Sequence, residues 1–424
     1  MPGSRILFTT LGSLGDLFPY LALATEMQRR GHQASILTSS HHRKRIEQAG
    51  IRFKQIAPDL DFTDKAFQQR TMHETTGGRY LLRDTILPQI RASYENLLAA
   101  ASDADLLVTH MITFAGPLVA AKTGLPWVST VLAPLSFFSR QDSPVLASRL
   151  HRLREFAPSL NAAINTAARS TTRSWNQPVY RLRSELGLPP GLEPIYEGQH
   201  SPSCVLALFS PAMAKTQPDW PAHTQITGFP AWDEEIVNTE ELSRLDEFLA
   251  AGPPPVVFTL GTSAVLNPGR FYEVSIEAVR RLGLRAVLLD GSSRPGQHSE
   301  PDILHLAWAP HTYLFSRAAL TVHSGGMGTC AAALRAARPM LVTPFAYDQP
   351  DNAFRLVRMG VARTIGRNSY TAARAAKEIG ILLADPRYLA NARRLAAEVN
   401  AEDGTRLACD ALERIAGRKN NATR

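Results

Sequence analysis

The sequence consists of two successive series of short apolar runs, separated by longer amphipathic or loop-like stretches. The runs are RILFTT, QASILTS, DLLVTH, PWVSTV and CVLALF in the first half, and PVVFTLG, AVLLDG, ILHLA, LTVHSGG and MLVTPF in the second. Short apolar runs that alternate with helical patterns are typical of parallel β-sheets covered by helices. Two such series predict an α/β protein with two Rossmann-like domains that face each other across a cleft.

A proline-rich stretch, SPAMAKTQPDWPAHTQITGFPAWDEE, interrupts the alternation between the two series. Proline density on this scale marks a connection between domains rather than an element of a core. With 424 residues the chain also exceeds the usual size of one domain. We therefore expect an N-terminal domain over residues 1–215, a connection over 216–254, a second domain over 255–405, and a C-terminal helix and tail over 406–424.

Composition excludes several classes of protein. Hydrophobic residues make up 44% of the chain and charged residues 20%, as in soluble globular proteins. No apolar stretch approaches the roughly 20 residues that span a bilayer. The first strand begins almost at once, without a cationic lead and an apolar signal core, so we do not expect export. Three scattered cysteines, Cys204, Cys330 and Cys409, predict reduced thiols and, with the other features, a cytoplasmic protein.

The net charge of +8, from 46 basic and 38 acidic residues, raises the question of a nucleic-acid partner. Only the stretch from Arg140 to Arg183 is markedly basic, and it contains no recognisable nucleic-acid-binding motif. We therefore expect no nucleic acid to bind. A solvated helix face explains the stretch, and the alternative is attraction of the protein to an anionic lipid surface that carries a lipophilic substrate.

The first apolar run leads into a glycine-bearing turn, TTLGSLGDLFP, and then into a helical pattern. A strand, a glycine turn and a helix open many nucleotide-binding units, but Gly12 and Gly15 do not fit the G-x-G-x-x-G fingerprint. An acid, Asp16, stands where the start of the helix would otherwise receive a phosphate. Helix capping explains an aspartate here without any further function, and the helix N-terminus is expected to lower its pKa.

The densest group of candidate binding residues lies between Trp308 and Asn352. Its centre, LTVHSGGMGT, combines a strand, His323, several glycines and a helix of small residues. Backbone N–H groups at such a helix start can hold a diphosphate, to which the imidazole adds a donor. A packed loop with a satisfied histidine is the alternative that needs no ligand. Trp308 can stack on a base, and Asp348 with Gln349 can bind vicinal hydroxyls.

The motifs HSGGMGT, WAP, PFAYDQPDN and GSLGDLFP together resemble the family 1 nucleotide-sugar glycosyltransferases of the GT-B fold, over nearly the whole chain. GSLGDLFP and DWPAHTQITGFPAWD look most like the bacterial branch that contains the rhamnolipid rhamnosyltransferase and sterol-type glucosyltransferases. The resemblance implies an inverting, metal-independent transfer of a hexosyl unit from a UDP- or dTDP-sugar, of the UDP-glucose or dTDP-rhamnose type. The acceptor would be a hydroxyl of a lipophilic molecule such as a lipid, sterol, polyketide or flavonoid, and no resident cofactor is implied.

The resemblance also implies roles for individual residues. Asp16 stands where many relatives carry a catalytic histidine, which implies that it is the general base. Trp308 would stack on the nucleobase, and the backbone at Ala309 would pair with the edge of that base. Asp348 and Gln349 would bind the sugar hydroxyls. The residues implied around the diphosphate are Thr262, Ser263, His323, Gly325, Gly326, Gly328 and Thr329.

Three features of the sequence bear on the choice of donor and on metal binding. Many UDP-sugar members hold the ribose hydroxyls with a glutamate where this chain has Ala331. Because a deoxyribose offers only one hydroxyl, the absence of this glutamate favours a dTDP-sugar. Sterol-type relatives without the glutamate nevertheless use UDP-glucose. The DLD run at Asp59 to Asp61 lies in a predicted loop, so we expect no metal there. His41 and His42 lack further ligands at metal spacing and are expected at the surface.

We expect the N-terminal domain to hold the acceptor, through residues 62–98 and the loop after VSTVLAPLSFF. Three other functions remain open. A sugar-nucleotide 2-epimerase of the same fold would release free sugar, and a catalytically silent homologue would bind a partner enzyme or a lipid. A dinucleotide-dependent oxidoreductase is disfavoured, because neither glycine turn matches the fingerprint.

Overall fold

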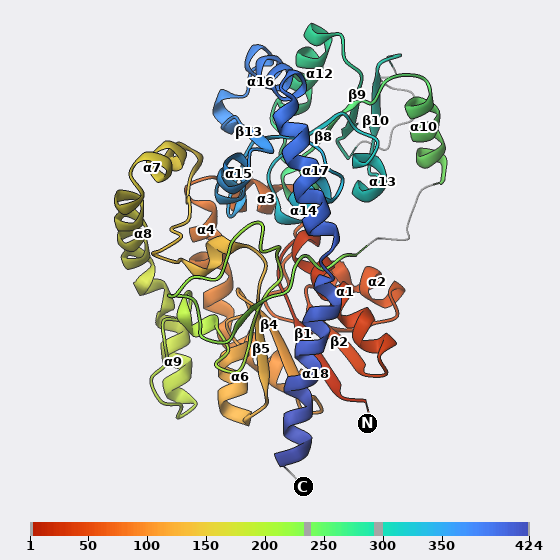
Figure 1. Ribbon diagram of the computed structural model, residues 1–424. Coiled ribbons are helices and arrows are strands. Elements are labelled where there is room, and N and C mark those ends of the chain that lie inside the picture. The colour runs from red at the N-terminus through yellow and green to blue at the C-terminus, as the bar shows by residue number, and fades with distance from the viewer. Residues whose placement is uncertain (1–2, 233–238, 292–299, 423–424) are drawn as a thin grey trace.

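The computed structural model describes residues 3–232, 239–291 and 300–422. It contains two parallel β-sheets, one above the other in Figure 1, and each sheet is covered by helices. This confirms the predicted α/β architecture of two Rossmann-like domains. The three cysteines, which all lie in the described ranges, are buried and form no disulfide. No helix of the described residues is long and apolar enough to cross a membrane.

Within the described residues, the N-terminal sheet has seven parallel strands in the order β3-β2-β1-β4-β5-β6-β7. The central strand β1 is apolar because it is covered on both faces, and it pairs Ile6 with Ala34 on one side and with Leu106 on the other. The strands are β1 (Arg5–Thr9), β2 (Gln33–Thr38), β3 (Arg52–Gln55), β4 (Leu106–His110), β5 (Trp127–Val131), β6 (Val205–Ala207) and β7 (Thr224–Ile226).

The helices of the N-terminal domain follow the strands in chain order. They are α1 (Leu14–Arg29), α2 (Arg43–Gln48), α3 (Lys65–Thr71), α4 (Gly77–Arg79), α5 (Ile90–Ala100), α6 (Gly116–Thr123), α7 (His151–Phe156), α8 (Pro158–Thr172) and α9 (Gln177–Glu185). Helix α1 buries Leu17, Tyr20, Leu21 and Met27 against the sheet. Short single turns are η1 (Ser40–His42), the π-helical η2 (Tyr80–Ile86), η3 (Leu87–Gln89), η4 (Pro134–Phe137), η5 (Ser148–Leu150), η6 (Arg173–Asn176) and η7 (Glu197–Gln199).

The C-terminal sheet has six parallel strands among the described residues, in the order β10-β9-β8-β11-β12-β13. They are β8 (Val256–Thr259), β9 (Ala286–Leu289), β10 (Ile303–Leu306), β11 (Leu320–His323), β12 (Met340–Val342) and β13 (Ala362–Thr364). The surrounding helices are α10 (Thr239–Ala250), α11 (Gly261–Ala264), α12 (Phe271–Leu282), α13 (His311–Phe315), α14 (Met327–Arg335), α15 (Gln349–Arg358), α16 (Ala372–Ala384) and α17 (Pro386–Asn400), with the short turn η8 (Arg367–Ser369).

The range 216–254, which we expect to connect the domains, contains regular structure from both of them. Strand β7 extends the N-terminal sheet beyond residue 215 by pairing with β6, and α10 lies beside β10 of the other sheet. The proline-rich composition permits β7 because Pro221 precedes the strand, whose own N–H groups stay available for the ladder. Residues 233–238 of the range lie outside the described residues.

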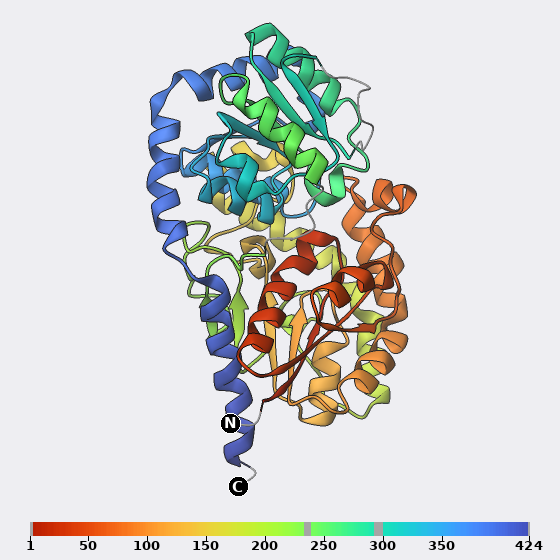
Figure 2. The ribbon, with the colours of Figure 1, turned by 90° about the vertical axis from the view of Figure 1, so that its right-hand side faces the viewer.

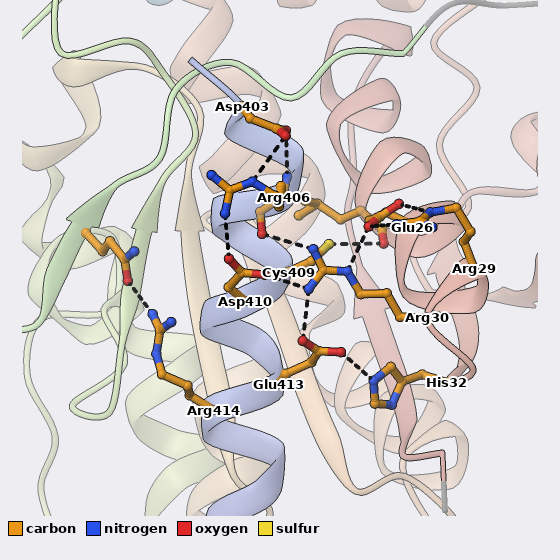
Figure 3. Close-up of polar contacts among 12 residues, drawn as sticks. Glu26, Arg29, Arg30, His32, Asp403, Arg406, Cys409, Asp410, Glu413 and Arg414 are labelled. Atoms are coloured by element: carbon orange, nitrogen blue, oxygen red, sulfur yellow. Dashed lines mark hydrogen bonds and ion pairs between the residues drawn. The ribbon is translucent and has the colours of Figure 1, made fainter. Parts of the chain in front are cut away.

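The chain returns to the N-terminal domain at its last helix, α18 (Gly404–Ala422), which Figures 1 and 2 show running along that domain. Leu412 and Ile415 on this helix join the core beneath α1. The Arg30 guanidinium at the end of α1 pairs with Asp410 at 2.7 Å and with Glu413 at 2.9 Å, as Figure 3 shows. Helix α1 is therefore held by the sheet on one side and by α18 on another.

The two passages of the chain between the domains touch each other. One passage follows β7, and the other separates α17 from α18. A Cβ added to Gly404 would lie 2.6 Å from the backbone of Gly228, so only glycine permits this approach. Beside it, the N–H of Ala231 donates to the Thr405 hydroxyl at 3.2 Å, and the Ser210 hydroxyl donates to Glu402.

Candidate functional site

The strand orders create one crevice at the carboxyl edge of each sheet. In the N-terminal sheet the chain runs from β1 outward to β3 and then returns to the opposite side of β1 as β4. In the C-terminal sheet it runs from β8 outward to β10 and returns on the other side of β8 as β11. Open α/β sheets bind their ligands at such reversals. The two crevices meet, because the Thr262 hydroxyl after β8 donates to the Ser13 hydroxyl after β1 at 3.4 Å.

Asp16 lies in the first turn of α1, at the crevice of the N-terminal sheet. The backbone N–H of Ser13 donates to its Oδ2 at 2.8 Å, and the reciprocal bond from the Asp16 backbone N–H to the Ser13 side chain completes a capping box. The Ser13 hydroxyl also donates to Oδ2, at 3.3 Å. The capping role considered for Asp16 is therefore present. The side chain remains 33% exposed, and Oδ1 lies 3.8 Å from Nε2 of His110. One oxygen is thus fixed by the cap while the other lies toward the neighbouring strand.

The turn before Asp16 requires glycine at one position. Gly12 has a φ of +135°, and a Cβ there would lie 2.1 Å from Oδ2 of Asp16. The Gly12 carbonyl forms a hydrogen bond of 3.0 Å with Nε2 of His42, which is buried. The expectation that His42 lies at the surface was therefore wrong, because the backbone of the turn provides its partner. His41 is partly buried, with its ring 3.7 Å from that of His42.

His110 is a residue of the site that the sequence analysis missed. It ends β4, is buried, and packs edge-on against Tyr20 with the ring centres 6.0 Å apart. Burial lowers the pKa of His110 to about 4, so the imidazole is neutral at physiological pH. The signal was present in the run DLLVTH, whose last residue reaches the crevice only because β4 is the neighbour of β1.

The pKa of Asp16 is raised, contrary to the expected lowering by the helix N-terminus. Burial at the domain interface raises it to about 7, and the negative charge of Asp348 from the other domain adds to the effect. The hydrogen bonds from Ser13 act in the opposite direction but do not outweigh burial. A carboxyl with this pKa changes its ionisation near neutrality, which ordinary aspartates do not do.

His323 ends β11 at the crevice of the C-terminal sheet and is completely buried. Its Nδ1 accepts a hydrogen bond of 3.1 Å from the Gly325 N–H, so in the neutral ring the proton resides on Nε2. Burial lowers the pKa of His323 to about 3, which keeps the ring neutral. Nε2 has no hydrogen-bond partner among the described residues. The site therefore contains a buried donor for which the described residues supply no acceptor.

The glycine turn leads directly into α14. Its N-cap residue, Gly326, has no side chain to satisfy the first N–H groups of the helix, and Gly328 in the first turn is exposed. Thr262 and Ser263, on the short helix α11, are half-buried beside this turn, since Gly261 approaches the Thr329 hydroxyl. The predicted diphosphate residues from the two loops are therefore brought together around one positively polarised helix start.

Asp348 and Gln349 stand at the start of α15. Asp348 accepts a hydrogen bond of 2.7 Å from the Asn352 amide, which also donates to the Gly325 carbonyl at 2.9 Å. Burial raises the pKa of Asp348 to about 6. The side-chain oxygen of Gln349 accepts from the N–H groups of Phe345 and Ala346 at 2.8 and 3.1 Å. This oxygen therefore stabilises the loop that precedes α15.

Trp308 and Ala309 follow β10, at the same carboxyl edge but on the outermost strand of the sheet. Ala309 is buried and Trp308 is partly exposed. The segment approaches His323 through His311. Burial is the main cause of the lowered pKa of His323, and the His311 ring lowers this pKa further. Asp348 lies close enough to Asp16 for its charge to raise the pKa of Asp16, and the Asn352 amide links Asp348 to the glycine turn that follows His323. Trp308 follows the edge strand β10.

The remaining charged candidates have structural partners. Asp59 accepts from the Ser40 N–H at 2.7 Å and from the Gln55 amide at 2.8 Å, and Asp61 accepts from the N–H and hydroxyl of Thr63. In the described part of the chain, no group of three or more histidine, cysteine, aspartate or glutamate side chains is arranged to hold a metal ion.

Within the basic stretch, two arginines are not solvated surface charges. Arg154 pairs with Asp142 at 3.1 Å, and Arg169 pairs with Glu193 at 2.9 Å and with Glu197. The remaining arginines of this stretch that are exposed include Arg140, Arg149 and Arg152.

Comparison with known proteins gives matches to both halves of the chain. Residues 6–109 match the Glycosyltransferase family 28 N-terminal domain, and residues 276–411 match the Erythromycin biosynthesis protein CIII-like, C-terminal domain. The chain is 31% identical to the O-mycaminosyltylonolide 6-deoxyallosyltransferase of Streptomyces fradiae, over 99% of each chain. It is 26% identical to the sterol 3-beta-glucosyltransferase of Pichia angusta, which covers 96% of this chain but only 33% of that longer relative.

Among solved structures, the spinosyn rhamnosyltransferase SpnG complexed with thymidine diphosphate superimposes with a TM-score of 0.66. The two sequences are 20% identical, and the superposition covers 95% of this chain and 98% of SpnG. This similarity extends to both domains of the fold.

The pKa of Asp16 predicts a dependence of stability on pH. A carboxyl whose pKa rises from 3.8 in the unfolded chain to about 7 in the folded protein stabilises the fold at low pH, and this contribution is lost as pH rises through that window. The Asp16→Asn variant has no carboxyl to titrate, so it does not lose this stability as pH rises. The melting temperature of the variant minus that of the parent should therefore be larger at pH 8 than at pH 5. Thermal unfolding followed by circular dichroism at both pH values measures the difference.

The control is Asp61→Asn. The Thr63 hydroxyl lowers the pKa of Asp61, so the stabilising contribution of its charge is lost only below pH 4, and this variant should be destabilised equally at pH 5 and pH 8. If the difference in melting temperature between Asp16→Asn and the parent is the same at both pH values, Asp16 titrates like an ordinary surface carboxyl.

Proposed function

The chain belongs to the GT-B glycosyltransferases that combine a family 28 N-terminal domain with an EryCIII-like C-terminal domain, and from this premise we propose an inverting, metal-independent hexosyl transfer. Members of this group move a sugar from a nucleotide sugar to a natural product or a sterol. The observation that carries the proposal is the position of Asp16 at one crevice opposite the unpaired Nε2 donor of His323 and the start of α14 at the other.

The C-terminal crevice suits the leaving diphosphate. Negative charge gathers on the diphosphate as the bond to the sugar breaks, and the first N–H groups of α14 point their positive ends toward that charge. Nε2 of His323 would donate one more hydrogen bond, and Thr262 with Ser263 would contact the group from the facing loop. These neutral donors supply the stabilisation for which other glycosyltransferases use a metal ion.

The donor is proposed to be a dTDP-sugar. Ala331, on the buried side of α14, offers no carboxylate to the hydroxyls of a ribose. A deoxyribose, which has one hydroxyl fewer, therefore loses no hydrogen bond at this position. Two comparisons agree with this choice: the Streptomyces relative is named for transfer of a 6-deoxy sugar, and SpnG is a rhamnosyltransferase with thymidine diphosphate bound. Trp308 and Ala309 would bind the base, and Asp348 and Gln349 the sugar hydroxyls.

The proposed general base is Asp16. The acceptor hydroxyl gives its proton to Oδ1, the oxygen that the capping box leaves available, while its oxygen forms a bond to the anomeric carbon. The bond from that carbon to the diphosphate breaks at the same time, and its electron pair leaves with the diphosphate. A single displacement of this kind inverts the anomeric centre. The raised pKa makes Asp16 a stronger base than an ordinary aspartate, provided that it is ionised.

The N-terminal domain would hold a lipophilic acceptor. Residues 62–98 contain an aromatic series in which Phe67 lies 5.3 Å from Phe62 and 6.0 Å from Tyr80, ring centre to ring centre. The relatives are named for a macrolide and for a sterol, which are both bulky and largely apolar. Contact with anionic lipid would use the exposed arginines of the Arg140 to Arg183 stretch, since Arg154 and Arg169 are already paired.

A donor and acceptor screen tests the proposed function. The protein is incubated with dTDP-rhamnose or UDP-glucose, with and without a macrolide or sterol acceptor, and with EDTA in a parallel set. We expect release of nucleotide that depends on the acceptor, that is greater with dTDP-rhamnose, and that EDTA does not change. Release of free sugar without an acceptor would instead indicate a 2-epimerase, and binding without turnover would indicate a catalytically silent homologue.

His323→Ala tests the diphosphate site. Loss of one hydrogen bond to a charged group costs about 1.5–3 kcal/mol, so affinity for dTDP should fall by roughly 10- to 100-fold. Isothermal titration calorimetry of both proteins measures this change. His223→Ala is the control, because His223 is exposed near β7 in the other domain and should leave affinity unchanged. An unaltered dissociation constant for His323→Ala would place the diphosphate elsewhere.

Asp16→Asn tests the base. Asparagine can keep the cap but cannot take a proton, so single-turnover transfer at saturating donor should slow about 10²- to 10⁴-fold. The parent's kcat/KM should fall as pH drops below about 7, because Asp16 must be ionised and its pKa lies there. Asp59→Asn is the control, since among the described residues this exposed carboxylate accepts hydrogen bonds only from the Ser40 N–H and the Gln55 amide. A rate for Asp16→Asn within a few-fold of the parent would leave Asp16 as a helix cap alone.

A further inference from the structure

A buried group of four charged side chains joins the two domains beside the site. Asp142 lies in the loop between η4 and η5, and Arg154 lies on α7, both in the N-terminal domain. Asp351 and Arg355 lie one turn apart on α15 of the C-terminal domain. The exposed fractions of these side chains are 15%, 11%, 1% and 6%, in the order named. Two positive and two negative charges make the group neutral, and we call it the interdomain clamp.

Every carboxylate oxygen of the clamp has a donor. Oδ1 of Asp142 accepts from Arg154 at 3.1 Å, and its Oδ2 accepts from Nη1 of Arg355. Oδ2 of Asp351 accepts from Nε of Arg355 at 2.7 Å, and its Oδ1 accepts from the backbone N–H of Val145 at 2.9 Å. The guanidinium of Arg355 thus bridges an aspartate of its own helix and an aspartate of the opposite domain.

The loop that carries Asp142 is fixed to its own domain. The amide of Asn165, on α8, donates to the Ser143 hydroxyl and to the Pro144 carbonyl, both at 2.8 Å. The amide of Asn161, one turn earlier, donates to the same two oxygens at 3.0 Å. This loop therefore moves with the N-terminal domain. The clamp links the loop to α15 of the C-terminal domain.

Helix α15 carries the proposed sugar-binding residues at its start. Asp348 occupies the residue before the first turn of the helix, Asp351 lies within that turn, and Asn352 links the helix to the glycine turn through the Gly325 carbonyl. We propose that Asp142 and Arg355 are positioning residues, which hold α15, and with it Asp348, at a fixed separation from Asp16 across the interface. This inference rests on the proposed function, because it assigns the clamp to alignment of the donor sugar with the base.

The chemistry of the clamp favours positioning over simple stabilisation. Buried ion pairs are often no more stabilising than well-packed apolar residues of similar size, because removing the charges from water offsets their attraction. Their geometric requirement is strict, however, since each oxygen accepts along a defined direction and a guanidinium presents its donors in a fixed plane. A neutral group with all its oxygens paired therefore specifies one arrangement of the two domains more closely than an apolar contact would.

Asp142→Asn tests the inference, with Glu193→Gln as the matched control. Glu193 pairs with Arg169 inside the N-terminal domain, so its loss breaks an arginine–carboxylate pair without touching α15. Because small misplacements of reacting groups slow transfer strongly, kcat of Asp142→Asn should fall about 10- to 100-fold. The dissociation constant for dTDP should stay within threefold of the parent, and the share of donor lost to water should rise. Glu193→Gln should change none of these.

Arg355→Lys gives a second route to the same answer. Lysine keeps the positive charge but cannot serve both aspartates and the Met213 carbonyl in the same geometry, so its kcat should lie between those of the parent and Asp142→Asn. A kcat of Asp142→Asn within twofold of the parent would overturn the inference. So would equal losses in Asp142→Asn and Glu193→Gln, which would reveal a general loss of stability.

Hydrogen exchange separates this inference from the proposed function. The Val145 N–H bonds to Asp351 across the domains, so peptides that contain Val145 and peptides from α15 should lose protection together in Asp142→Asn. This readout needs no substrate. If the parent transfers no sugar but the two peptides still lose protection together, the proposed function fails while the mechanical link stands; if only one peptide changes, the clamp does not couple the domains.

Discussion

In a parallel sheet all strands end at the same edge, and this constraint brings the glycine turns and the candidate site residues of each domain to one edge of its sheet. Each sheet reverses its strand order once, beside β1 in one domain and beside β8 in the other. The glycine turns after β1 and after β11 occupy those two reversals. Between the domains, the interdomain clamp joins α15 to the loop that carries Asp142.

The electrostatics of the interface divide the site into two chemically different halves. On the N-terminal side, burial and the charge of Asp348 make Asp16 hold a proton near neutrality. On the C-terminal side, burial keeps His323 neutral and leaves a donor on Nε2. In the proposed reaction, the first half would accept the proton once Asp16 is ionised and the second would receive the negative charge of the diphosphate.

Local pattern sufficed for the architecture but not for the parts that depend on which strands are neighbours. The apolar runs predicted the inner strands and the edge strand β10. The other edge strands, β3 (RFKQ), β7 (TQI) and β13 (ART), were not recognised because an edge strand needs only modest apolar content. The candidate residues of the glycine turns were identified from motifs. His110 was missed because its role depends on β4 lying beside β1. The pKa of Asp16 was misjudged because its main cause, burial, and the smaller effect of the Asp348 charge both arise from the folded structure and not from the local sequence.

The clamp could not be predicted from sequence at all, since Asp142 and Arg355 are 213 positions apart and each resembles an ordinary surface charge. The two passages of the chain between the domains have a further mechanical meaning. They touch at Gly228 and Gly404, where a Cβ on Gly404 would lie 2.6 Å from the Gly228 backbone. A side chain at this one position would therefore displace both connections between the domains at once.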